Sequence, residues 1–269
     1  MGSQMKIGFI GLGNMASAII GGMLDKGIVQ PGDIIGSEKL EAAAQRARER
    51  FGITAGTDNC ATAREADILF LAVKPNFMTE VIEQIRAEVR KETVVVSIAA
   101  GRTLAYLKET FARPELKIVR CMPNTPALVR EGCTGVSAGE EVPQEDLDKV
   151  LELLRSFGKA SIVPERLMDV VVGVSGSSPA YVFLFIEAMA DAAVAGGMPR
   201  QQAYEFAAQA VLGSAKLVLE TGMHPGQLKD MVCSPGGTTI EAVKVLEEKG
   251  MRAAVMDATL ACIEKSRNL

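Results

Sequence analysis

The most distinctive polar segment of the chain is Ser234-Pro235-Gly236-Gly237-Thr238-Thr239. It lies just ahead of residues 240–248, a run that strongly favours an amphipathic helix. Its glycines leave successive backbone N–H groups accessible, its threonines add hydroxyl donors, and the N-terminus of the helix directs its positive end to the same place. This combination is suited to bind a small carboxylate or an imine.

A second loop, near the other end of the chain, is suited to bind a nucleotide. The pattern Gly11-x-Gly13-x-x-Ala16 follows the apolar run 6–10 and opens a stretch, 14–26, with apolar residues at helical spacing. The first glycine permits a tight turn, the second lets a pyrophosphate approach the backbone, and the small third residue permits close packing of helix on strand. The pattern predicts a dinucleotide site; the alternative is a strand–helix turn with incidental glycines.

The end of the next expected strand, 33–37, bears on which dinucleotide binds. It reads Gly36-Ser37-Glu38-Lys39. An acidic residue here is typical of NAD binding, whereas small polar and basic residues are typical of NADP binding. Ser37 and Lys39 could hold a 2′-phosphate while Glu38 faces solvent. We therefore favour NADP(H) and leave NAD(H) open.

Three further strand ends carry candidate ligand contacts, because ligands of open parallel sheets bind beyond the carboxyl ends of the strands. Ala72-Val73-Lys74-Pro75 would face the nicotinamide side, although Lys74 could equally be a surface charge. Residues 97–101 are small apart from Ile98 and leave room for a flat ring. The segment 122–126 is a rigid polar loop between two prolines, or simply a structural turn.

The elements that must position these loops divide the chain into two parts. Expected strands alternate with expected helices in the first part, which predicts an α/β fold with a parallel sheet covered on both faces. The strands are 6–10, 33–37, 68–73, 93–99, 116–121, 132–138 and 158–163, and the helices are 14–26, 38–51, 76–90, 102–110 and 144–157.

From residue 165 onward the pattern is helical, with Val170–Val174 as the one possible strand. These segments are rich in alanine and apolar on more than one face, so they are expected to bury that surface against a second subunit. The expected helices are 178–195, 200–221, 225–232, 239–249 and 252–267.

Composition excludes several classes of partner. The net charge of −4, with scattered Lys and Arg, argues against nucleic acid. The sequence has no apolar run of about 18 or more residues and no signal-type N-terminus, so we expect a cytoplasmic protein without membrane partners. Five cysteines without a C-x-x-C pair and a single histidine, His224, indicate no disulfide framework and no metal site.

Taken together, these motifs resemble the pyrroline-5-carboxylate reductase family. The segments that carry the resemblance are Phe9–Gly13, Ala72–Pro75, Arg120–Pro126, Val174–Tyr181 and Asp230–Ala242. The resemblance runs from Met5 to about Arg267. It implies a Rossmann dinucleotide-binding domain, residues 1–163, followed by an all-α dimerisation and substrate domain, residues 164–269. It also implies NADPH as the usual reductant, NADH in some members, and homodimers assembled into larger rings, often decamers.

The resemblance also implies site residues by position. The expected pyrophosphate contacts are Ile10, Gly11, Leu12, Gly13, Asn14 and Met15. Asn59 would contact the adenosine ribose, and the nicotinamide side would be formed by Ala72, Val73, Lys74, Pro75, Ala99 and Ala100. The substrate would lie among Glu165, Ser234, Gly236, Gly237, Thr238 and Thr239. The chain departs from the family pattern at Glu38, which interrupts the polar 2′-phosphate cluster.

The implied reaction is hydride transfer to the C=N carbon of 1-pyrroline-5-carboxylate, which gives L-proline, with Thr239 as the catalytic hydrogen-bond donor to the ring nitrogen. Two rival interpretations remain. A 3-hydroxyacid dehydrogenase or another imine reductase would use a lysine of the helical half, for which Lys216, Lys229 and Lys244 are available. A non-enzymatic NADP(H)-sensing protein would need no polar substrate loop.

Overall fold

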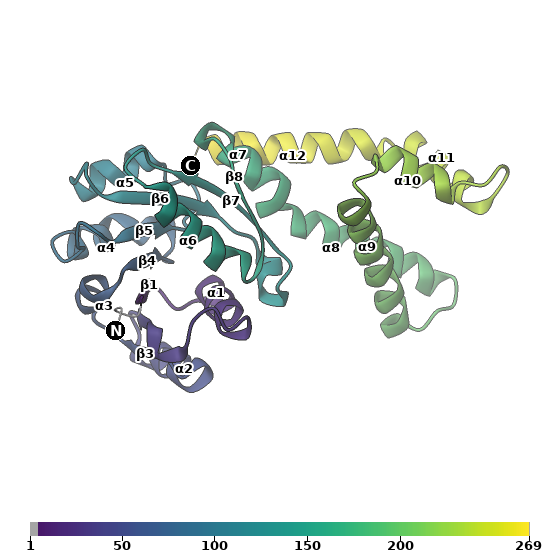
Figure 1. Cartoon of the computed structure of the whole chain (residues 1–269). Helices are drawn as coiled ribbons and strands as arrows, with labels where there is room; N and C mark the ends of the chain where they lie inside the picture. Colours follow the sequence, from purple (N-terminus) through teal and green to yellow (C-terminus); the bar gives the residue numbers. More distant parts are fainter. Residues whose placement is uncertain (1–4, 269) are drawn as a thin grey trace. The chain divides into compact units, whose positions relative to one another are not determined.

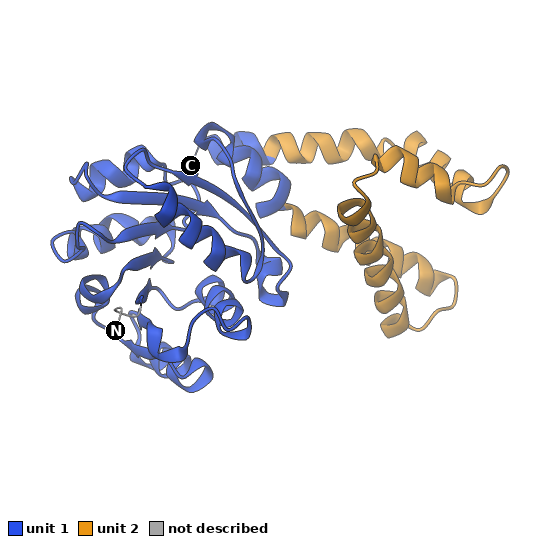
Figure 2. Ribbon diagram, in the orientation of Figure 1, with its two compact units in different colours: residues 1–177, 262–269 blue, residues 178–261 orange. Residues whose placement is uncertain are grey.

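A computed structural model describes residues 5–268 of the chain (Figure 1). The chain forms two compact units, one of residues up to 177 together with those from 262 onward, the other of residues 178–261 (Figure 2). By this division residues 164–177 group with the first unit, whereas the predicted domain boundary lies between residues 163 and 164.

The described part of the first unit is built on an eight-stranded sheet of order β3-β2-β1-β4-β5-β6-β7-β8. Its strands are β1 (Ile7–Ile10), β2 (Ile34–Ser37), β3 (Thr54–Gly56), β4 (Ile68–Leu71), β5 (Val94–Ser97), β6 (Lys117–Met122), β7 (Gly132–Ala138) and β8 (Gly158–Ile162). Adjacent strands pair in parallel except β6 and β7, which are antiparallel. The predicted α/β class is therefore confirmed.

Helices cover the two faces of this sheet. On one face α1, α2 and α6 contribute to a single apolar cluster, and on the other face α3, α4 and α5 contribute to a second one. These helices are α1 (Asn14–Asp25), α2 (Glu41–Phe51), α3 (Asn59–Glu65), α4 (Met78–Ile85), α5 (Leu104–Phe111) and α6 (Gln144–Arg155).

The central strands form because their sequences can be buried on both faces. Every residue of β1, β4 and β5 is buried, and such near-continuous apolar runs are typical of parallel strands between two helical layers. The rings of Phe9 and Phe70 stack with centroids 4.8 Å apart and planes 6° from parallel. This packing fixes β1 beside β4, and the nucleotide loop follows directly from β1.

The sequence failed to predict β3 and α3. The three residues of β3, Thr-Ala-Gly, contain no bulky apolar side chain, so no periodic signal marks the strand. Helix α3 is short and begins at a side-chain cap, in which the Asp58 carboxylate accepts from the Ala61 N–H at 3.0 Å. An aspartate cap of this kind was the one available sign of the helix.

The possible strand Val170–Val174 is wrong. These residues belong to α7 (Met168–Val171) and to a π-helical segment, Val172–Gly176. The side chain of Val171 lies over β7 at Gly135, where an added Cβ would come within 2.9 Å of it. Because β8 already pairs with β7, this valine-rich segment packs on the sheet as a helix.

The chain leaves and re-enters the first unit at one place. The Cys262 thiol lies 3.2 Å from the Ser177 hydroxyl, and four residues later the Ser266 hydroxyl donates to the Asp169 carboxylate at 2.7 Å. The last residues of α12 (Met251–Arg267) therefore belong to the first unit.

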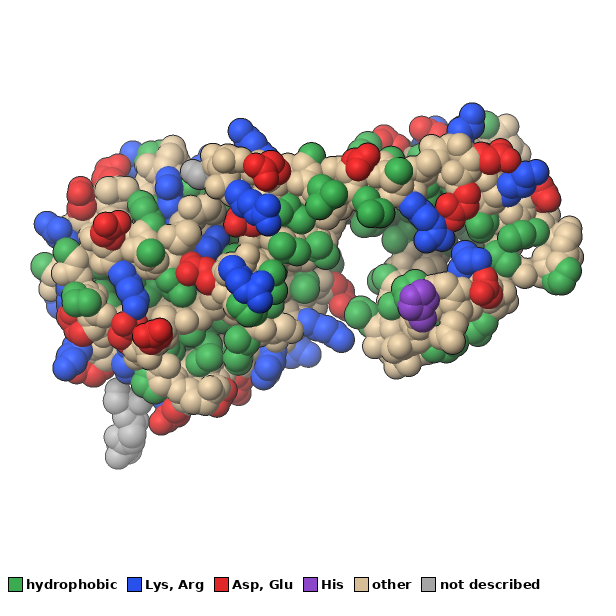
Figure 3. All heavy atoms as spheres, turned by 90° about the horizontal axis from the view of Figure 1, so that it is seen from above, with side chains coloured by type: hydrophobic (Ala, Val, Ile, Leu, Met, Phe, Trp, Pro, Cys, Tyr) green, Lys and Arg blue, Asp and Glu red, His purple; other side chains and the backbone are tan. Residues whose placement is uncertain are grey.

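The second unit consists of helices with little core of their own. Besides most of α12, these are α8 (Ser178–Ala195), α9 (Arg200–Thr221), α10 (Pro225–Val232) and α11 (Thr238–Glu248). Its one buried cluster is centred on three alanines, Ala190, Ala203 and Ala207, among the described residues. Large apolar side chains remain exposed, including Phe183, Leu184, Phe206 and Leu219, and Figure 3 shows apolar side chains on the surface of this unit.

One helical stretch of the described chain, residues 165–195, is long and apolar enough to span a membrane, with a mean hydropathy of 1.5. The core helix of a soluble protein meets the same criteria. Only 6% of the apolar 18-residue segment of this stretch is buried within the chain. This agrees with the expectation that these helices need a second surface to cover them.

The thiol of Cys121 gives a test of the sheet. Cys121 lies in β6 and is 1% exposed, and burial raises the pKa of its thiol. Because only the thiolate reacts, we expect no modification by iodoacetamide at pH 8 in the folded protein and full modification in denaturant. Mass spectrometry of peptides measures both states. Labelling of folded Cys121 at the rate of the exposed Cys133 would contradict this burial.

Candidate functional site

The loop between β1 and α1 has the two glycine environments that a pyrophosphate site needs. Gly11 has φ of +92°, and a Cβ there would lie 2.7 Å from the carbonyl oxygen of Ala72. Gly13 is the N-cap of α1 with an ordinary φ of −71°, and a Cβ there would meet nothing within 4 Å. The first glycine is thus required by the fold, whereas the second leaves an open cradle above the loop.

The N-terminus of α1 supplies donors to this cradle. The first N–H groups of a helix have no partner within it, and the helix dipole attracts negative charge to them. Gly13 bears no side chain that could cap α1. The loop therefore fits a dinucleotide pyrophosphate.

A cleft of about 440 Å³ extends from this loop across the ends of β1, β2 and β4. Of the predicted cofactor residues, it is lined by Ile10, Gly11, Gly13, Ser37, Lys39, Asn59, Ala72, Val73 and Lys74. The structure therefore gathers most of the predicted set around one cavity.

Six residues that line the cleft were absent from the predicted set. They are Glu38, Thr57, Phe77, Glu80, Val81 and Gln84. Phe77, Val81 and Gln84 are spaced as one face of a helix, so the spacing i, i+4, i+7 in and before α4 was a usable signal. Thr57 follows β3, and without that strand nothing in the sequence placed it at the sheet's edge.

The ribose end of the cleft is organised by polar contacts. Ser37 is fully buried, and its hydroxyl lies 2.7 Å from Asn59 Oδ1. The Asn59 amide in turn donates to Gln84 Oε1 at 2.9 Å. The Lys39 ammonium lies 5.5 Å from the centre of the Phe77 ring, across the same cleft. Ser37 and Lys39 are therefore each engaged with a neighbouring side chain.

Glu38 does not have the solvent-facing orientation that the sequence suggested. Its Oε2 accepts a hydrogen bond from the Leu12 N–H at 3.0 Å, and its Oε1 accepts from the Lys39 N–H at 2.8 Å. The carboxylate is thus fixed against the nucleotide loop.

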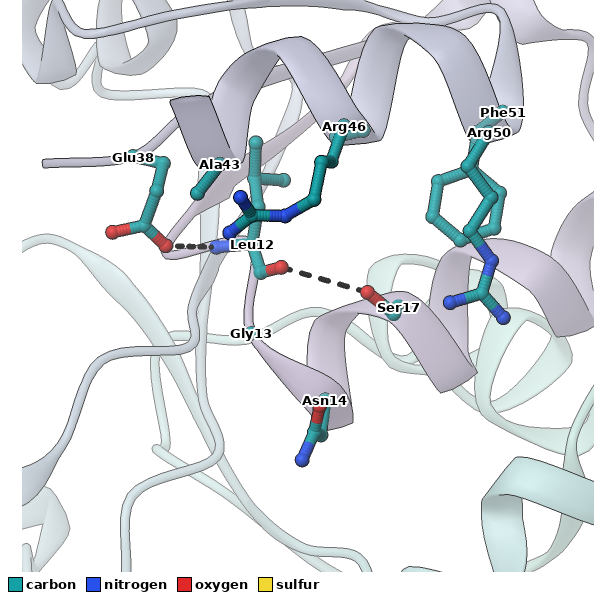
Figure 4. A pocket seen from close by; sticks show the side chains of 10 residues that line it. Leu12, Gly13, Asn14, Ser17, Glu38, Ala43, Arg46, Arg50 and Phe51 are labelled. Atoms are coloured by element: carbon teal, nitrogen blue, oxygen red, sulfur yellow. Dashed lines mark hydrogen bonds between the residues drawn. The ribbon is translucent and has the colours of Figure 1, made fainter. Parts of the chain in front are cut away.

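A second cavity, of about 430 Å³, lies on the other side of the loop, between α1 and α2. Leu12 and Asn14 line this cavity and not the cleft, whereas Gly13 and Glu38 line both. Figure 4 shows Arg46 reaching from α2 toward Leu12, with Glu38 on the opposite side of Leu12. Arg46 and Arg50 give this cavity a basic wall.

The other predicted cofactor residues, Met15, Pro75, Ala99 and Ala100, are all within the described chain and lie outside both cavities. Pro75 begins a short 3₁₀ turn, Pro75–Phe77. Its carbonyl oxygen accepts from two nitrogens of Arg102, at 3.2 and 3.0 Å. Arg102 thereby joins the loop after β4 to the loop after β5, which contains Ala99 and Ala100.

Glu165 is anchored in the first unit. Its Oε1 accepts from the Leu104 N–H, at the start of α5, at 2.7 Å and from Arg120 Nη1 at 3.1 Å. Arg120 is buried in β6 and 5% exposed. A carboxylate at the N-terminus of a helix is also favoured by the helix dipole. Glu165 is therefore held beside the loop that follows β5.

Asn124 has a structural role in the loop between two prolines. Its amide donates to the Ser175 carbonyl at 2.9 Å and its Oδ1 accepts from the Cys133 N–H at 2.8 Å. Both the amide N–H and the oxygen of the side chain thus bind neighbouring segments, which favours the interpretation of residues 122–126 as a structural turn.

The polar loop of the second unit is a tight turn that ends in a helix. Gly236 has φ of +65°, and the Gly237 N–H donates to the Ser234 carbonyl at 3.1 Å. A Cβ on Gly237 would lie 2.4 Å from the Ser234 hydroxyl. Gly237 is the N-cap of α11, which begins at Thr238. The glycines thus present the N–H groups of the first turn without a capping side chain, as an anion site requires.

Comparison with known proteins identifies the family. Residues 165–269 match the model described as pyrroline-5-carboxylate reductase dimerisation, and residues 6–101 match the one described as NADP oxidoreductase coenzyme F420-dependent. Pyrroline-5-carboxylate reductase of Escherichia coli (strain K12) is 56% identical over 266 residues, which cover 99% of this chain and 98% of the relative. The chain belongs to the pyrroline-5-carboxylate reductase family.

Solved structures agree with this assignment. The pyrroline-5-carboxylate reductase of Coxiella burnetii has a TM-score of 0.92 and 34% identity, covering 99% of this chain and 98% of that one. The Plasmodium falciparum pyrroline carboxylate reductase, solved with NADP bound, has a TM-score of 0.88 and 32% identity, covering 98% and 97%.

The family settles several of the predictions made from sequence. A Rossmann domain followed by a helical dimerisation domain is confirmed, as is an NAD(P)H-dependent oxidoreductase that uses NADP(H). The chain has a dimerisation domain and is a reductase that acts on a small molecule. The hydroxyacid dehydrogenase and the non-enzymatic sensor are set aside.

The two glycines of the nucleotide loop are expected to respond differently to alanine. Gly13→Ala should keep the melting temperature, because its backbone conformation suits alanine and its Cβ meets open space. It should weaken NADPH binding by about tenfold or more, since the methyl group fills the cradle. Gly11→Ala should destabilise the fold by at least about 1–2 kcal/mol. Calorimetry and nucleotide-fluorescence titration measure both effects; equal loss of stability in both variants would contradict this assignment.

Proposed function

We propose that this chain reduces L-1-pyrroline-5-carboxylate to L-proline, the final step of proline biosynthesis. The observation that carries the proposal is the 56% identity to the E. coli reductase over 99% of the chain, a span that includes both anion-binding loops. When bound, the dinucleotide supplies the hydride for the C=N carbon. NADPH oxidation that depends on pyrroline-5-carboxylate, followed by absorbance at about 340 nm, tests the reaction.

The substrate carboxylate is proposed to bind at the N-terminus of α11. The Gly237 N–H closes the turn onto the Ser234 carbonyl, whereas the N–H groups of Thr238 and Thr239, in the first turn of α11, have no acceptor within the helix. The positive end of the helix dipole adds to their attraction for a carboxylate. Ser234, Gly236, Gly237 and Thr238 are accordingly proposed as substrate-binding residues.

The role proposed for Thr239 is to hydrogen-bond the ring nitrogen. Thr239 is half-buried in the first turn of α11. A protonated imine is already electrophilic, so the site needs no strong acid and must mainly supply orientation. Glu165, which Arg120 and Leu104 hold in place, is the substrate-binding residue proposed from the first unit.

Two of the three lysines that a hydroxyacid dehydrogenase could use, Lys229 and Lys216, offer no comparable chemistry. Lys229 donates to Asp230 at 2.6 Å, and this hydrogen bond raises the pKa of its ammonium group. Such a lysine is a poorer proton donor than a free one, because its charged form is stabilised. Lys216 lies on the surface beside Glu220, 3.5 Å away. Neither lysine is poised for acid–base work.

Replacement of Thr239 tests its role. Thr239→Ala should lower kcat/KM for pyrroline-5-carboxylate by roughly ten- to a thousandfold, the loss expected for one well-placed hydrogen bond in the transition state. Thr239→Ser retains the hydroxyl and is the matched control, expected to keep most of the activity. Binding of NADPH should be unchanged in both. An unaltered kcat/KM in the alanine variant would remove Thr239 from the mechanism.

We further propose that the polar loop of one subunit acts with the nucleotide cleft of its partner. The match of residues 165–269 to a dimerisation domain supports this arrangement. Co-expressing Thr239→Ala chains with Gly13→Ala chains should then restore activity, because some sites in the mixed dimers combine two intact parts. Each variant alone serves as the control. If mixed dimers are as inactive as the single variants, both parts of the site come from one chain.

Assembly of dimers into a decameric ring in the cytoplasm is proposed from the family resemblance. Contacts between subunits would cover the large apolar side chains that are exposed on the second unit.

A further inference from the structure

We propose that Glu38 selects between the two reductants and makes NADH preferred over NADPH. This inference rests on the proposed function, since it concerns the reductant of that reaction. Glu38 would accept a hydrogen bond from the ribose 2′-hydroxyl of NADH and repel the 2′-phosphate of NADPH.

The position of Glu38 carries the first part of the argument. It directly follows β2 and lines the cleft together with Gly11, Gly13 and Asn59. In dinucleotide-binding sheets a carboxylate at this strand end is the acceptor for the adenosine ribose. The side chain that occupies the discriminating position is therefore acidic.

The orientation of Glu38 carries the second part. The N–H groups of Leu12 and Lys39 each hold one carboxylate oxygen, at 3.0 and 2.8 Å. An ionised carboxylate has about four acceptor sites, so both oxygens can still accept from a ligand hydroxyl. Glu38 is thus a pre-organised acceptor at the rim of the cleft, and a phosphate brought there would meet a fixed negative charge.

Two residues that could contact a 2′-phosphate at the same place, Ser37 and Lys39, lie against other side chains. Ser37 is fully buried and its hydroxyl pairs with Asn59. Lys39 extends over the Phe77 ring. Two further basic residues, Arg46 and Arg50, line the second cavity, which shares Gly13 and Glu38 with the cleft. These arginines account for continued use of NADPH, so the preference is a ranking and not an exclusion.

The test is a fluorescence titration of NADH and NADPH without substrate, at one fixed salt concentration. The native protein should bind NADH more tightly. In Glu38→Ser the ratio of the two dissociation constants should shift toward NADPH by about tenfold or more, the size expected when a like charge is removed beside a phosphate. Glu38→Gln keeps the shape of the side chain and should shift the ratio in the same direction.

Glu41→Gln is the matched control. Glu41 is exposed at the start of α2 and lines neither cavity within the described chain, so removal of its charge should leave the ratio unchanged. Tighter NADPH binding by the native protein, or an equal shift in the Glu41 and Glu38 variants, would overturn the proposal. Turnover of pyrroline-5-carboxylate is measured in parallel. If binding follows Glu38 but neither nucleotide supports turnover, the proposed reaction fails and the role of Glu38 stands.

Discussion

The close approach of the backbone at Gly11 to the neighbouring strand ends is the constraint on which the nucleotide cleft depends. The Gly11 N–H donates to the Ser37 carbonyl at 2.8 Å, while the Ala72 N–H donates to the Ile10 carbonyl at 2.8 Å. The ends of β1, β2 and β4 are thereby joined at one point. The cradle at Gly13 and the cleft wall at Ala72 are both positioned by that junction, and only glycine allows the approach.

Much of this arrangement could be predicted from sequence because it is encoded locally. The glycine spacing after an apolar strand and the Ser-Pro-Gly-Gly-Thr-Thr turn before a helix each specify their own backbone. The orientation of Glu38 could not be predicted, since its partner, the Leu12 N–H, is 26 positions away in the chain. The valines at 170–174 suggested a strand, and this prediction failed for the same reason. Their β propensity is a local signal, whereas their packing on β7 as a helix depends on residues distant in the sequence.

The two units differ in how they obtain their stability. The sheet buries bulky side chains such as Phe9, Phe70 and Phe157 within the chain, whereas the cluster of the helical unit is centred on small alanines. A helical unit of this kind gains most of its apolar burial from association. The dimerisation domain identified by family comparison is therefore the part of the chain that buries the fewest large apolar side chains without a partner.

The contact between Ser177 and Cys262 gives the helical unit a particular evolutionary freedom. Because the chain departs and returns at side chains 3.2 Å apart, the intervening segment is an insertion with adjoining ends. Insertions of this geometry can be exchanged without disturbing the host, since the host closes over a short gap. Exchange of this segment for another helical unit, with a different polar loop, would require two junctions, one at residue 177 and one at residue 262.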